Sequence, residues 1–125
     1  KPMEYENEEG YKIFVGRNNV MNDKLTLKTA KNYDMWFHVK DMPGSHVIVQ
    51  SNGGEFTDKV IRQAALLAAY NSKAGSSSNV PVDYTLVKNV KKPSGAKPGI
   101  VIYVDYKTEF VTPNVQEIER IKRIV

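Results

Sequence analysis

The chain contains no cysteine, one tryptophan and two histidines among its 125 residues. Without cysteine it can form neither a disulfide framework nor a cysteine-ligated zinc site. It also lacks any run approaching the roughly 18 consecutive apolar residues of a membrane-spanning helix, and no charged segment followed by an apolar run resembles a secretory leader. Together these absences favour a protein of the reducing cytoplasm that does not act in a membrane.

The length and the hydrophobic content indicate one folded unit. A chain of 125 residues with 41% hydrophobic residues can bury a core of its own, as is usual for a domain of this size. Since the chain starts at Lys1 and not at a methionine, we expect residues 1–125 to be a single domain of a longer, multidomain protein.

The charges are unevenly distributed along the chain. The net charge is only +4, and four of the acids fall within the first nine residues: Glu4, Glu6, Glu8 and Glu9. Residues 84–104 contain no acid, and all four of their charged side chains are lysines: Lys88, Lys91, Lys92 and Lys97. We therefore expect one edge of the domain to be distinctly positive, as a contact for nucleic acid would be.

Alternating patterns predict a mostly antiparallel sheet. Residues 11–15 form a first strand, residues 35–40 and 46–50 form a hairpin around the turn at 42–45, and residues 82–87 form a further strand. The apolar run 100–106 is expected to be a central strand with 108–112 as its hairpin partner. The first strand is expected to lie next to the strand at 35–40.

Helix signals are fewer. The longest helix is predicted over residues 57–74, with Thr57 as its N-cap and Gly75 just beyond its end. Asn18 or Asn19 can cap a short helical stretch that runs toward Ala30, and Asn114 begins a short C-terminal helix. The fold class is therefore α+β, a mostly antiparallel sheet with one major helix packed on it and a short C-terminal helix.

The stretch 34–47 holds the tryptophan and both histidines. On a strand, Met35, Phe37 and Val39 face one side, and Trp36, His38 and Lys40 face the other. The second group can stack on a base and neutralise a phosphate. The alternative is that Trp36 belongs to the core and that the pleat has the opposite sense.

Lys59, Arg62 and Lys73 lie on one arc of the long helix, with Leu66 and Tyr70 between them. This arc is either a contact for nucleic acid or protein, or a face that the C-terminal segment or a missing domain covers.

Catalytic and metal-binding patterns are not found. His38, His46 and the neighbouring aspartates have no recognised ligand spacing, and Ser45 and His46 are adjacent on a strand and so point to opposite faces. The loops at 16–19 and 93–99 match neither a P-loop nor a dinucleotide fingerprint. We expect no enzymatic activity, no metal ion and no cofactor.

Three segments resemble one known family in order and in detail: VGRNNVMNDKLTLKTA at 15–30, DMWFHVKDMPGSHV at 34–47 and YTLVKNVKKPSGAKPGIVIYV at 84–104. They are similar to the NFACT-R domain of bacterial proteins called fibronectin-binding protein A or RqcH-type ribosome quality-control factors. The resemblance covers about residues 10–112. It implies a C-terminal fragment of a protein that also has an NFACT-N domain, a helix-hairpin-helix region and a coiled-coil arm.

The resemblance also implies a function. The domain would bind RNA, with tRNA, the large ribosomal subunit and the other domains of its own chain as partners, in a factor that adds alanine tails to stalled nascent chains. The residues expected to contact RNA are Arg17, Asn18, Asn19, Trp36, His38, Lys40, His46, Lys88, Lys91, Lys92 and Lys97. The alternative is a fragment of a surface adhesin that binds fibronectin, and an enzyme that uses His38 and His46 is the least favoured hypothesis.

Overall fold

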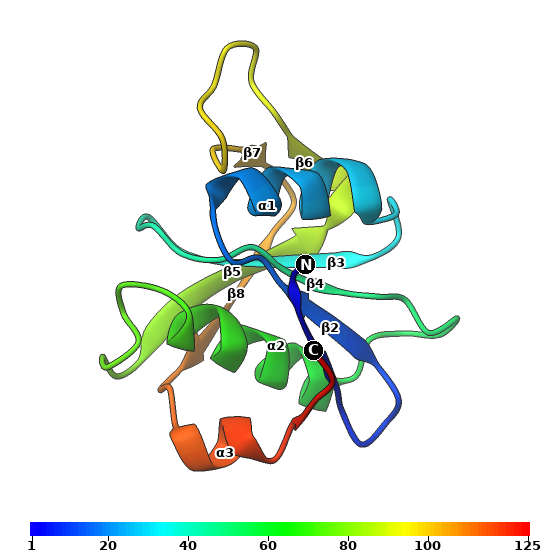
Figure 1. Cartoon of the computed structure of the whole chain (residues 1–125), viewed down its shortest axis with the longest axis vertical. Helices are drawn as coiled ribbons and strands as arrows, with labels where there is room; N and C mark the ends of the chain where they lie inside the picture. The colour runs from blue at the N-terminus through cyan, green and yellow to red at the C-terminus, as the bar shows by residue number, and fades with distance from the viewer.

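The computed structural model describes all 125 residues as a seven-stranded antiparallel sheet with helices on both faces (Figure 1). The strand order is β8-β5-β3-β4-β2-β1-β9. The strands are β1 (Met3–Glu6), β2 (Lys12–Val15), β3 (Met35–Val39), β4 (Val47–Val49), β5 (Val80–Leu86), β8 (Lys107–Val111) and β9 (Lys122–Arg123). A separate two-stranded sheet pairs β6 (Val90–Lys91) with β7 (Ile102–Tyr103).

The helical segments are α1 (Asn19–Lys24), the π-helical turn η1 (Leu25–Thr29), α2 (Asp58–Tyr70), the 3-10 turn η2 (Val87–Asn89) and α3 (Val115–Glu119). Asn18, Thr57 and Asn114 accept the N-terminal amide hydrogen bonds of α1, α2 and α3, as predicted. The predicted α+β class, with one major helix on an antiparallel sheet and a short C-terminal helix, is confirmed. No helix combines the length and the apolar character needed to cross a membrane.

The face of the sheet that carries α2 holds the larger core. Phe37 and Val39 pack there with the α2 residues Val60, Ala64 and Leu67. The small side chains of α2 allow close approach of helix and sheet, which increases the apolar area removed from water. In Figure 1, α2 and α3 lie together below the sheet.

On the side of α2 that carries Lys59, Arg62 and Lys73, Leu66 is covered by the C-terminal segment, which is one of the two alternatives predicted for this side. Its side chain is only 1% exposed and packs in the same core as Ile118 and Ile121 of the C-terminal segment. Tyr70 stays 43% exposed. Two basic residues of the arc form ion pairs, Lys59 with Glu8 at 3.6 Å and Arg62 with Glu117 at 3.3 Å, so this surface is partly neutralised.

The opposite face of the sheet carries α1, η1 and the β6–β7 hairpin, which lie above the sheet in Figure 1. Trp36 and Ile48 point to this side and form a second, smaller cluster with Leu25, Val87 and Val90. The alternation predicted for residues 35–39 is therefore correct, because Phe37 and Val39 face α2 while Trp36 faces the hairpin.

The strand predicted over 100–106 is wrong in length and position. Only Ile102–Tyr103 is a strand, and it pairs with β6 outside the main sheet. Ile100, Ile102 and Val104 are 56%, 59% and 59% exposed, while Val101 and Tyr103 pack on the second cluster. The predicted hairpin partner, β8, pairs with β5 instead.

Two smaller expectations also differ from the structure. The first strand does not lie beside β3, because β4 is inserted between them. The major helix ends at Tyr70 and not near residue 74, since the chain after it pairs with the turn that follows β3: Ser45 N donates to Asn71 O at 3.1 Å. The sheet edge formed by β1 and β9 was not predicted at all.

Candidate nucleic-acid interface

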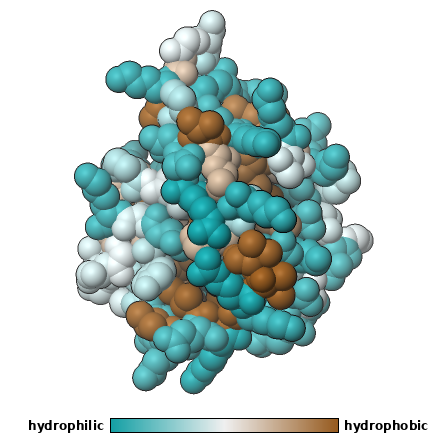
Figure 2. Space-filling view, viewed as in Figure 1, coloured by the Kyte–Doolittle hydropathy of each residue, from teal (hydrophilic) through white to brown (hydrophobic).

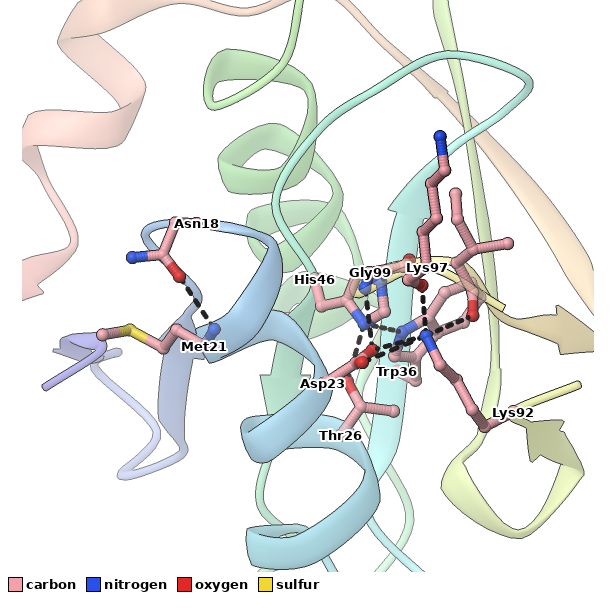
Figure 3. A network of polar contacts seen from close by, with 10 residues as sticks. Asn18, Met21, Asp23, Thr26, Trp36, His46, Lys92, Lys97 and Gly99 are labelled. Carbon is pink, nitrogen blue, oxygen red and sulfur yellow. Dashed lines mark hydrogen bonds and ion pairs between the residues drawn. The ribbon is translucent and has the colours of Figure 1, made fainter. Parts of the chain in front are cut away.

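The three sequence motifs meet at His46, which is 1% exposed. Its Nδ1 lies 3.1 Å from Trp36 Nε1 and 2.8 Å from Thr26 Oγ1, and its Nε2 lies 3.0 Å from Gly99 O (Figure 3). A carbonyl oxygen only accepts and an indole N–H only donates, so Nε2 carries the proton and Nδ1 accepts from Trp36. This neutral ring joins η1, β3 and the loop before β7.

The protonation of His46 is set by its surroundings. Burial, followed by the nearby His38 ring, lowers the pKa of His46 to about 4, because a low-dielectric site disfavours the charged form. Burial also lowers the pKa of His38, against the attraction of Asp83. Both rings are therefore neutral at pH 7, and the Trp36–His46 hydrogen bond is kept.

A second link holds the loop against α1. Asp23 accepts from Gly99 N at 2.9 Å and pairs with Lys92 Nζ at 3.0 Å. Lys92 also donates to the carbonyl oxygens of Lys97 and Ile100. Lys92 is one of the lysines predicted to contact RNA, and in the structure its ammonium group has these partners inside the domain.

Two glycines of the motifs permit these close approaches. A Cβ on Gly16 would lie 1.9 Å from Asn22 Oδ1, the atom that accepts from His46 N at 3.1 Å. Gly99 has φ +86°, a conformation that favours glycine, and a Cβ there would lie 2.9 Å from Asn19 Oδ1. Much of the motif pattern thus maintains the geometry of the loop.

Lys40 is also committed to an internal contact. Its Nζ lies 3.1 Å from Asp83 Oδ2, and the hydrogen bond to Asp83 raises the pKa of Lys40. The buried Asp83 carboxylate also accepts from Tyr103 Oη and from Thr108 Oγ1 at 2.8 Å. The prediction that Lys40 shares a face with Trp36 is correct, but its ammonium group has a carboxylate partner.

The Trp36 ring is enclosed within the domain. The ring is 0% exposed and packs against Tyr103 at 4.6 Å between ring centroids. The alternative prediction, that Trp36 belongs to a core, is confirmed. Trp36 nevertheless points to the face of the sheet opposite Phe37 and Val39, as the first prediction had it. The hairpin, which comes from a distant part of the chain, covers this face.

The polar residues of the first motif, at 17–19, have different roles in the structure. Asn18 Oδ1 caps α1 by accepting from Met21 N at 2.8 Å, and Arg17 Nε donates to Lys1 O at 2.7 Å. Arg17 does not join the group around Trp36, because the strand that precedes it is separated from β3 by β4. Asn19 remains exposed at the start of α1.

A group of exposed lysines lies on this side of the sheet. We call it the basic surface, and its members are Lys24, Lys28, Lys31, Lys88, Lys91 and Lys97. The hydrogen bond from Lys88 N to Asn32 O, at 3.1 Å, brings its two parts together. Figure 2 shows hydrophilic side chains over much of this end of the molecule, with a few apolar patches between them.

Half of the basic surface, Lys24, Lys28 and Lys31, is not among the RNA contacts predicted from the sequence. Lys24 and Lys28 are four residues apart and so share one side of the α1–η1 helix, a signal that could have been used. Residues 16–32 and 87–104 together hold eight basic residues and one acid, whereas the rest of the chain holds ten basic residues and thirteen acids. The positive charge is therefore concentrated on this face.

A cavity of about 420 Å³ opens beside the basic surface. We call it the His46 cavity. Its lining comes from Asn19 of α1, from Trp36 and His38 of β3, from residues 41–44 and His46, and from residues 99–101 and Tyr103. The group contains aromatic rings, an amide and backbone polar groups. Nowhere in the chain do three or more His, Asp or Glu side chains gather in a group able to hold a metal ion.

Comparison with known proteins gives consistent results. The model of the NFACT protein RNA binding domain matches residues 1–105. The "Rqc2 homolog RqcH" of Bacillus subtilis is 49% identical to this chain, over 95% of this chain and 20% of that protein. The protein of the same name in Streptococcus pneumoniae is 47% identical, over 89% of this chain and 20% of that protein. The chain thus spans about a fifth of the length of these relatives.

A solved structure also matches closely. The C-terminal part of the fibronectin/fibrinogen-binding protein from Streptococcus suis superposes with a TM-score of 0.91 at 46% sequence identity. The match covers 98% of this chain and 49% of that one.

Proposed function

Because this chain belongs to the family of NFACT RNA-binding domains, we propose that it is the RNA-contacting module of a ribosome quality-control factor of the RqcH type. In this role it contacts tRNA and the large ribosomal subunit in the cytoplasm. The other domains of the full-length protein act with it to add C-terminal alanine tails to stalled nascent chains.

The basic surface is the observation that carries this proposal. Its six lysines are exposed and lie on the side of the sheet that carries α1 and the β6–β7 hairpin, opposite the acids of α2 and α3. Lysine ammonium groups neutralise phosphates and release counterions, which supplies affinity without reading sequence. A surface of this kind suits the backbone of a folded RNA.

The perturbed side chains favour binding over catalysis. His46 is held between Trp36 and Gly99, and Lys40 is held by Asp83. Strongly shifted pKa values are typical of catalytic groups, but here burial and internal partners account for the shifts. We propose no enzymatic reaction for this domain.

The name of the Streptococcus suis relative supports a second candidate, binding to fibronectin. One set of binding measurements separates the two. Labelled tRNA, fibronectin and polyglutamate are titrated with the chain at several salt concentrations. We expect binding to tRNA that weakens with salt by about 0.7–0.9 log units per log unit of salt for each phosphate contact, with weak binding to polyglutamate. Tight binding to fibronectin without binding to tRNA would reverse the order of the candidates.

A further inference from the structure

The His46 cavity has the dimensions of a ligand site and lies next to the basic surface. Its volume of about 420 Å³ falls within the range of roughly 300–1,000 Å³ that is usual for small-ligand pockets. Lys97 precedes the lining residues Gly99 and Ile100, and its side chain extends away from His46 in Figure 3. An anionic strand lying on the basic surface would therefore pass the mouth of the cavity.

The backbone of β7 gives this cavity hydrogen-bonding groups. β7 pairs with β6 on one edge only, and Val104 N donates toward that side, to Asn89 O at 3.2 Å. Backbone groups alternate in direction along a strand, so those of Val101 and Tyr103 point to the unpaired edge. Both residues line the cavity, so their N–H and C=O groups at the unpaired edge are the candidate hydrogen-bonding groups of this wall.

Planar side chains form the neighbouring wall. The His38 ring stacks on Trp36 with an angle of 4° between ring planes and a centroid distance of 5.8 Å, and the Tyr103 ring is tilted against Trp36 at a centroid distance of 4.6 Å. Trp36 and His46 are buried, but His38 and Tyr103 are half-buried and reach the cavity. Proteins that recognise unpaired RNA bases combine stacking on such rings with hydrogen bonds to the base edges.

Two further polar groups stand at the rim. The Asn19 side chain reaches Gly99, and a carboxamide can both donate to a base edge and accept from it. Asp41 is exposed and has a left-handed backbone conformation, φ 56°. Its carboxylate can accept from an exocyclic amine, whereas it would repel a phosphate placed inside the cavity.

We propose that the His46 cavity binds one unstacked nucleobase of the RNA whose phosphates lie on the basic surface. This inference rests on the proposed function, since the strand must first be held by the lysines. A peptide added as an extra strand to β7 is a weaker fit, because β7 is only two residues long and strand addition draws its affinity from a row of main-chain hydrogen bonds. Peptide binding is instead one outcome of the test.

The first test fills the cavity and leaves the charge unchanged. Asn19→Trp places an indole at the cavity rim, and Val20→Trp is the matched control because Val20 is the next residue of α1, is 68% exposed and does not line the cavity. We expect Asn19→Trp to weaken tRNA binding by about tenfold, as loss of one stacked base does, at an unchanged salt dependence. Val20→Trp should bind like the unchanged chain.

The second test examines the cavity without a long RNA, so that it does not depend on the first. The four ribonucleoside 5′-monophosphates and ribose 5-phosphate are titrated into the isotopically labelled chain and followed by NMR. We expect shifts of the Val101, Tyr103 and Gly44 amides and of the Trp36 indole with at least one nucleotide, none of them with ribose 5-phosphate, and none with any ligand in Asn19→Trp.

The outcomes separate this inference from the proposed function. If tRNA binding depends on the lysines but Asn19→Trp equals Val20→Trp and no nucleotide shifts these signals, the base site is refuted and the RNA-binding role stands. If the chain does not bind tRNA, the proposed function fails, and the nucleotide titration still decides the cavity. Shifts at the same residues with an extended peptide, and none with nucleotides, would assign the cavity to a protein partner.

Discussion

The two faces of the main sheet are held together by different kinds of interaction. The face that carries α2 is covered by a core cluster of 21 buried hydrophobic residues. The face that carries α1 and the β6–β7 hairpin has a cluster of only 5, around Trp36, and its hairpin is attached through His46, Asp23 and Lys92. The first face supplies most of the apolar burial, and the second uses directional polar bonds to fix the shape of a basic surface.

This difference indicates where function can reside. Apolar contacts depend on area and not on direction, so a large core stabilises a fold without determining the position of a surface loop. Hydrogen bonds have narrow geometry and can hold the lysine-bearing loop in one position. We therefore expect changes on the two faces to differ in what they alter, and the following predictions proceed from the largest effect to the smallest.

The largest expected effects come from substituting two adjacent residues of β3 whose side chains point to opposite faces of the sheet. Phe37 and Trp36 are both 0% exposed, and replacing either by alanine should lower the free energy of unfolding by about 3–5 kcal/mol, measured by urea denaturation. Phe37→Ala should leave the tRNA affinity of the folded fraction unchanged. Trp36→Ala should reduce it, because Tyr103 and the β7 edge lose their support. Equal affinity of the two folded variants would contradict the division between the faces.

The second prediction concerns pH. The pKa of His46 is about 4 in the folded chain and 6.5 without its surroundings. Between these values the unfolded chain binds the extra proton, so stability is fully present above pH 6.5 and falls as the pH drops toward 4. The loss attributable to this ring is about 3 kcal/mol. It should be measurable as a decrease in urea midpoint over this range.

A variant separates His46 from the other titrating groups. His46→Gln should be less stable at neutral pH and should show a flatter pH dependence between pH 6.5 and 4. His38→Gln should keep most of the part that comes from His46, since burial, the main cause of the low pKa of His46, does not depend on His38. A histidine ring signal that titrates near pH 6.5 at position 46 would show that this ring is not buried as described.

The third prediction compares two adjacent lysines. Lys92 is bound to Asp23 and to two carbonyl oxygens, whereas Lys91 is exposed. Lys92→Met should destabilise the chain by about 1 kcal/mol, the usual value of such bonds near a surface. Lys91→Met removes the same charge and should leave the urea midpoint unchanged. Equal stability of the two variants would remove Lys92 from the attachment of the loop.

The features that could be predicted from the sequence depend on residues close together in the chain. The caps at Asn18, Thr57 and Asn114 and the alternation of residues 35–39 are local patterns, and the structure has them. The burial of Trp36 could not be read in this way, because the hairpin that covers it comes from residues more than fifty positions later in the chain.

The misread apolar run at 100–106 has a related cause. Its alternate residues Ile100 and Ile102 are exposed, while Val101 and Tyr103 lie on the second cluster. Hydrophobic content alone suggested a central strand, but the polar bonds of Asp23 and His46 hold the preceding loop outside the main sheet. Ion pairs between distant residues, such as that of Lys92, leave no periodic signal in a sequence.

The most direct test of the basic surface compares two triple variants with the same change in net charge. The first replaces Lys24, Lys28 and Lys31 by alanine, and the second replaces Lys73, Lys107 and Lys122, which are equally exposed but lie outside the basic surface. The salt dependence of tRNA binding is measured for both. The first should weaken binding and lower the slope of log K against log salt by about 2, since each lost phosphate contact removes about 0.7–0.9, and the second should leave the slope unchanged. Equal effects of the two variants would contradict the account, because RNA would then respond to the net charge of the domain and not to this face.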